Sequence, residues 1–81
     1  MNLDSLKEKI AEALKDKNII VCSVTYKKNG KYNFLTVELD KVNGIDIDTI
    51  VDATHIINPI VDKEVTTKDS YILDVISKER G

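Results

Sequence analysis

The sequence predicts a small α+β domain in which two helices pack on one face of a three-stranded sheet. A chain of 81 residues has the length of one domain with a single small core. Its composition, 42% hydrophobic and 32% charged, is typical of a folded chain. Apolar residues recur at helical spacing in two segments and alternate in three others. These segments follow one another as helix, strand, strand, helix, strand.

The first helix is expected from Leu3 to Lys17. Its apolar residues are spaced three and four apart and therefore share one face: Leu3, Leu6, Ile10, Ala13 and Leu14. Asn2 or Asp4 can cap the first turn, because a short polar side chain accepts a bond from a free backbone N–H there. Asn18 is expected to end the helix.

A hairpin is expected next. The strand Ile19–Lys28 is rich in β-branched residues, and alternation puts Ile20, Cys22, Val24 and Tyr26 on one face. The turn spans residues 27–31, because Asn-Gly readily takes the positive φ angles of a hairpin turn. In the return strand, Tyr32–Asp40, one face carries Leu35, Val37 and Leu39 and the other carries Phe34, Thr36 and Glu38.

The second helix is expected to begin at a cap formed by Asp46 or Asp48. Its apolar stripe runs from Ile47 to Val61, but Pro59 removes one backbone bond and clashes with the preceding turn. The helix should therefore end near Ile57 or kink there. The third strand is Tyr71–Ile76, the domain occupies residues 1–77, and residues 78–81 are a charged tail. The expected core is Leu35, Val37, Leu73 and Val75 against Leu6, Ile10, Ile50 and Ile57.

Nothing in the sequence indicates an enzyme or a metal site. His55 is the only histidine, and no nucleophile motif accompanies it. Cys22 is the only cysteine and is expected to be a small buried hydrophobe. We expect no catalytic residue, metal, cofactor or small-molecule substrate.

The acidic residues around the second turn do not form a calcium loop. Asp40, Asp46, Asp48 and Asp52 cluster there, but aligning the loop glycine on Gly44 puts apolar residues at its first and last ligand positions. The two aspartates at the start of the second helix are better interpreted as caps.

The net charge and the low aromatic content disfavour strong binding to free nucleic acid. The net charge is −2, with one Phe, three Tyr and no Trp, and we assign Tyr32 and Phe34 to opposite strand faces. The residues best suited to a partner or RNA contact are Lys27, Lys28 and Lys31 at the hairpin. The alternative interpretation is that these lysines keep an exposed hairpin soluble.

No apolar stretch is long enough to cross a membrane, and the N-terminus is polar. We therefore expect a cytoplasmic protein.

The order of elements and four short stretches resemble the N-terminal domain of the RimP family of ribosome maturation factors. The matching stretches are 23–26, 37–41, 43–48 and 71–77. The resemblance implies an α-β-β-α-β fold and a non-catalytic part in maturation of the small (30S) ribosomal subunit. The implied partner is a ribosomal protein, rRNA or both. We expect the family's second, SH3-like domain to be absent from this chain.

A competing hypothesis comes from another functional class. The hairpin leaves sheet edges that can pair between chains, so the domain can instead be a self-associating interaction module without a ribosomal role. If the role is ribosomal, the acidic balance favours a partner with a basic surface, such as a ribosomal protein, over naked RNA.

Overall fold

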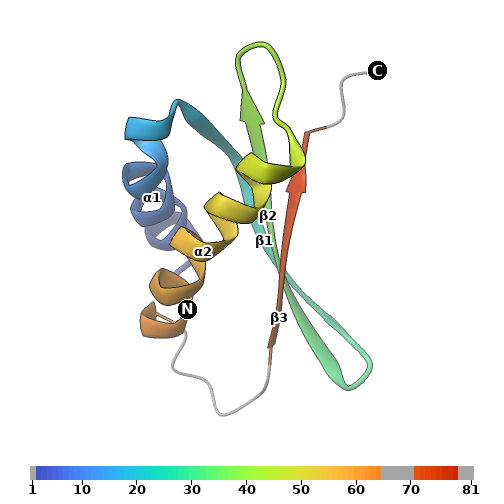
Figure 1. Cartoon of the computed structure of the whole chain (residues 1–81). Helices are drawn as coiled ribbons and strands as arrows, with labels where there is room; N and C mark the ends of the chain where they lie inside the picture. The colour runs from blue at the N-terminus through green and yellow to red at the C-terminus, as the bar shows by residue number, and fades with distance from the viewer. Residues whose placement is uncertain (1, 65–70, 79–81) are drawn as a thin grey trace.

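Two helices cover the same face of a three-stranded sheet, as predicted (Figure 1). The computed structural model describes residues 2–64 and 71–78. The elements are α1 (Leu3–Leu14), a 3₁₀ turn (Lys15–Lys17), β1 (Ile19–Asn29), β2 (Tyr32–Lys41), α2 (Ile47–Glu64) and β3 (Tyr71–Ser77).

The strand β2 lies in the middle of the sheet. Its neighbour β1 pairs with it antiparallel through the hairpin, whereas β3 pairs with it parallel on the other side. Parallel neighbours need a crossover connection, and α2 supplies it. The helix α1 packs over β1, α2 packs against β3, and the two helices contact each other.

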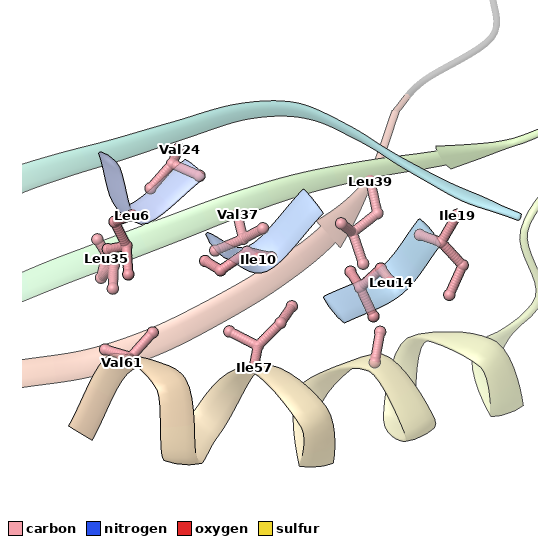
Figure 2. Close-up of a cluster of buried hydrophobic side chains, with 11 residues drawn as sticks. Leu6, Ile10, Leu14, Ile19, Val24, Leu35, Val37, Leu39, Ile57 and Val61 are labelled. Atoms are coloured by element: carbon pink, nitrogen blue, oxygen red, sulfur yellow. The ribbon is translucent and has the colours of Figure 1, made fainter. Parts of the chain in front are cut away.

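The core lies between the helices and the inward side chains of β2 (Figure 2). Leu35, Val37 and Leu39 are completely buried. Five of the predicted core residues are buried: Leu6, Ile10, Leu35, Val37 and Ile57. The other three, Ile50, Leu73 and Val75, are only part-buried and pack on the periphery. For the two in β3 the reason is position, because an edge strand is covered less completely than a central one.

A β-bulge divides β1 into two halves with opposite alternation. The register slips between Val21 and Ser23, so that Cys22 is the extra residue. Ile19 and Val21 therefore contact the core before the bulge, and Val24 does so after it. Ile20 points outward and is 50% exposed, so its predicted placement on the same face as Val24 is wrong. One inserted residue moves the later side chains of a strand to the face opposite the one that simple alternation predicts.

The helix α2 runs through Pro59 to Glu64, so of the two predicted outcomes, an end or a kink near Ile57, the end is wrong. The backbone bond that Pro59 cannot make would have gone to the carbonyl of His55. Both residues are exposed, and water can therefore solvate that carbonyl. Val61, one turn beyond Ile57, is completely buried, and its burial favours continuing the helix.

Polar side chains begin both helices. Asn2 Oδ1 accepts a bond from the Ser5 N–H at 3.1 Å, and Asp46 Oδ1 accepts one from the Thr49 N–H at 2.8 Å. Hydrogen bonds from the Thr49 side chain and backbone, with a smaller contribution from the charge of Lys41, lower the pKa of Asp46. Asn18, with φ 59°, takes the left-handed conformation that ends the first helical segment.

We predict that Val37→Ala lowers the free energy of unfolding by about 1–3 kcal/mol, because it leaves a cavity in a tightly packed layer. Urea denaturation of both proteins measures the difference. The control is Val42→Ala, the same change at a side chain that is 70% exposed, which should alter stability by less than about 0.5 kcal/mol. A Val37→Ala protein as stable as the parent would contradict the strand register.

The Asp46 cap predicts a pH-dependent contribution to stability. Because folding lowers the pKa of Asp46, its charge stabilises the fold fully above the unfolded pKa, near 4. That contribution disappears as the pH falls through the lower folded pKa. Asp46→Asn keeps an acceptor without the charge, whereas Asp46→Ala removes the acceptor.

Melting temperatures measured from pH 2 to 7 should therefore show Asp46→Asn below the parent protein at pH 7 and level with it in acid. Asp46→Ala should remain less stable than the parent at every pH. Identical curves for all three proteins would show that this side chain does not cap α2.

Candidate functional site

The hairpin turn is tighter than the sequence indicated. Asn29 and Tyr32 form the last strand pair, so the loop contains only Gly30 and Lys31. Gly30 has φ +64°, and Lys31 is not among the residues with positive φ, the pattern of a type II′ turn with glycine at its first central position. Asn29 is thus a strand residue, and Lys27 and Lys28 belong to β1 rather than to the turn.

The three predicted contact residues surround the hairpin tip instead of pointing the same way. Lys27 lies opposite Phe34 and Lys28 lies opposite Asn33. Asn33 is buried on the helix side of the sheet, so Lys28 lies on that side and Lys27 lies on the open face. The three lysines therefore do not project together from one turn, although all three are exposed.

No residue that the structure describes neutralises the charge at this tip through a salt bridge. Within the described ranges, none of the three lysines forms a salt bridge; Lys9 and Glu64 make the salt bridge found there. The sequence has no Asp or Glu in residues 17–37. Figure 1 shows the hairpin tip extending away from both helices, whose surfaces carry many of the acids. The tip is thus a local cationic region on a chain of net charge −2.

Two aromatic rings lie on the same face of the sheet as Lys27. The Tyr32 and Phe34 ring centroids are 6.5 Å apart, with the ring planes tilted by 51°. Their predicted assignment to opposite faces is wrong, because residues two apart in a strand share a face. Tyr32 is 60% exposed. We call the residues Lys27, Lys31, Tyr32 and Phe34 the hairpin patch.

The open face of the sheet changes character away from the hairpin. In the strand register, Phe34 lies beside Ile72, Thr36 lies beside Asp74, and Glu38 lies beside Ile76. The first carboxylate on this face, that of Asp74, therefore lies in the row of outward side chains next to the hairpin patch. This face has an aromatic, cationic end and an acidic end.

Two of the aspartates at the second turn, Asp46 and Asp48, stabilise the start of α2. Asp46 is its cap, and Asp48 lies in its first turn, where a negative charge is favoured by the helix dipole. The described part of the chain contains no group of three or more His, Cys, Asp or Glu residues placed to hold a metal ion. The structure therefore supports the interpretation of Asp46 as a cap.

Three further side chains are of types that can act in catalysis: Tyr71, His55 and Cys22. The Tyr71 hydroxyl donates a hydrogen bond to Asp62 Oδ1 and joins β3 to α2. Burial and this carboxylate raise the pKa of Tyr71 to about 12, which makes it a poor proton donor near neutral pH. His55 is exposed on α2, whereas Cys22 lies part-exposed at the bulge rather than buried as predicted.

A shallow hollow of about 760 Å³ lies between α1 and the first half of β1. Its lining carries no serine, threonine, cysteine or histidine and consists of Glu8, Ala11, Glu12, Lys15, Asn18, Ile19, Ile20, Val21 and Val42. These residues supply two carboxylates, the Lys15 amine and an apolar floor. Across the described residues, no helix combines the length and apolar character needed to span a bilayer.

Comparison with known families identifies the chain. The family model for the RimP N-terminal domain matches residues 9–78, a span that includes the second half of α1 and every later element. The predicted resemblance is confirmed, and the helix-strand-strand-helix-strand order agrees with it. RimP proteins are non-catalytic ribosome maturation factors that act in assembly of the 30S subunit. The chain belongs to the RimP N-terminal domain family.

Proposed function

We propose that this domain takes part in 30S maturation by binding rRNA of the immature subunit through the tip of the β1–β2 hairpin. Membership of the family implies association with the small ribosomal subunit. The observation that carries the finer proposal is the cluster of Lys27, Lys28 and Lys31, all exposed and without a salt bridge to any described residue. The site of action is then the cytoplasm, where subunits are assembled.

Phosphate contact is the interaction for which this tip is suited. Each lysine that neutralises a phosphate releases condensed counterions, which supplies affinity that falls as salt rises. Because Lys27 and Lys28 lie on opposite faces of the hairpin, they reach different phosphates when RNA passes along the tip. The negative net charge of the whole chain opposes RNA elsewhere and confines binding to this region.

Pairing between copies through β1 is disfavoured by the structure. The bulge at Cys22 interrupts the β1 edge, and lysines occupy its hairpin end. Both features hinder strand addition. If the lysines serve only to keep this edge soluble, their replacement should change self-association but not binding to the subunit.

We predict that replacing Lys27, Lys28 and Lys31 together by serine weakens association with immature small subunits. Co-sedimentation at several salt concentrations measures it, using subunits from a strain that lacks the maturation factor. The slope of log affinity against log salt should become flatter by up to about three phosphate contacts. Melting temperature should hardly change, because substitutions of exposed charges usually alter stability by less than about 0.5 kcal/mol.

A matched control carries Lys15→Ser, Lys17→Ser and Lys63→Ser. These three lysines are also exposed and lie outside the hairpin, so the control has the same net charge as the hairpin variant. It should retain a steeper salt dependence and tighter binding than the hairpin variant. Equal losses in the two variants would mean that overall charge, rather than the hairpin, governs association, and would refute the proposed site.

A further inference from the structure

We propose that the hairpin patch stacks an unpaired rRNA base on its aromatic rings, so that the domain prefers single-stranded RNA to duplex. This inference rests on the proposed function, because it assumes that the hairpin meets rRNA. It adds a second kind of contact, to the base instead of the phosphate.

The arrangement of the two rings is suited to a stacked base. Tyr32 and Phe34 lie on the same face at 6.5 Å, but the 51° tilt between their planes means that they do not stack on each other. Tyr32 is 60% exposed and is the accessible ring. Phe34 is part-buried, and its neighbours in the strand register are Lys27 in β1 and Ile72 in β3. Phe34 therefore forms the floor of the patch, and Tyr32 forms one side.

The charges around the rings favour a nucleotide. Lys27 lies across from Phe34, and Lys31 precedes Tyr32 in the turn. A base on the rings would thus have lysines within reach of its flanking phosphates. The nearest carboxylate on this face along β3 is Asp74, two residues beyond Ile72, and it marks the limit of the patch.

The extent of the apolar surface favours a base over a second protein. The rings and Ile72 are bounded by Thr25, Thr36 and Asp74 in the next row of outward residues. A few side chains cover far less than the roughly 800 Å² that each partner buries in a standard protein interface. One nucleobase needs only such a surface, and each stacked base contributes about 1–3 kcal/mol. Bases within an RNA duplex are already stacked and present no free face.

The test compares a ten-nucleotide single-stranded RNA with a duplex of the same length, each binding to the full chain at fixed low salt. Tyr32→Leu keeps an apolar side chain but removes the ring, whereas Tyr32→Phe keeps the ring. We expect Tyr32→Leu to weaken single-strand binding by about 5- to 100-fold, with duplex affinity unchanged and Tyr32→Phe close to the parent. In a separate salt series with the single-stranded RNA, the slope of log affinity against log salt should not change, because no phosphate contact is lost.

The triple serine variant at Lys27, Lys28 and Lys31 separates this proposal from the one on which it rests. If it weakens binding of both RNAs while Tyr32→Leu matches the parent, base stacking is refuted and the phosphate contacts stand. If the lysine variant changes neither RNA, the proposed function itself fails. If Tyr32→Leu instead converts a dimer to a monomer in analytical ultracentrifugation and leaves RNA binding intact, the patch is an interface between copies and the stacking proposal is overturned.

Discussion

The buried row Leu35, Val37 and Leu39 on the central strand is the constraint on which the rest of the structure depends. All three side chains are completely shielded from solvent, and their strand pairs with β1 on one side and β3 on the other. Both helices lie over this row. Because side chains alternate along a strand, the same burial forces Phe34, Thr36 and Glu38 onto the opposite, open face.

The helices do not cover the hairpin end of the sheet. The hairpin strands are long, with 11 and 10 residues, and their tip lies away from the helices. Tip residues therefore contribute little to the core, and polar or charged side chains there carry little cost in stability. This freedom allows three lysines and an exposed tyrosine to gather at one end, while Glu38 and Asp74 lie further along the sheet.

Local patterns were sufficient for much of the fold but not for the site. The inward row of β2, the apolar stripe of α1 and the Asp46 cap each depend on a few neighbouring residues, and they were predictable.

The bulge at Cys22 was not predictable, because the inserted residue is apparent only once β1 is paired with β2. The faces of Lys27 and Lys28 depend on the same pairing. The common face of Tyr32 and Phe34 follows from the two-residue strand period alone, because both residues lie in the same strand. The continuation of α2 through Pro59 depends on burial of Val61, a tertiary effect that outweighs a local penalty.

The two faces of the sheet have different roles. The inward face carries the fold that the family match supports, whereas the outward face carries residues proposed here to bind RNA. The match over residues 9–78 accords with a fold built on inward residues such as Val37, and it establishes the role in subunit assembly. Outward residues such as Lys27 and Tyr32 do not hold that fold together, since they lie on the uncovered face. Binding chemistry at the hairpin can therefore change without loss of the domain. Because the core tolerates such changes, a loss of RNA binding in a hairpin variant can be attributed to the contact rather than to unfolding.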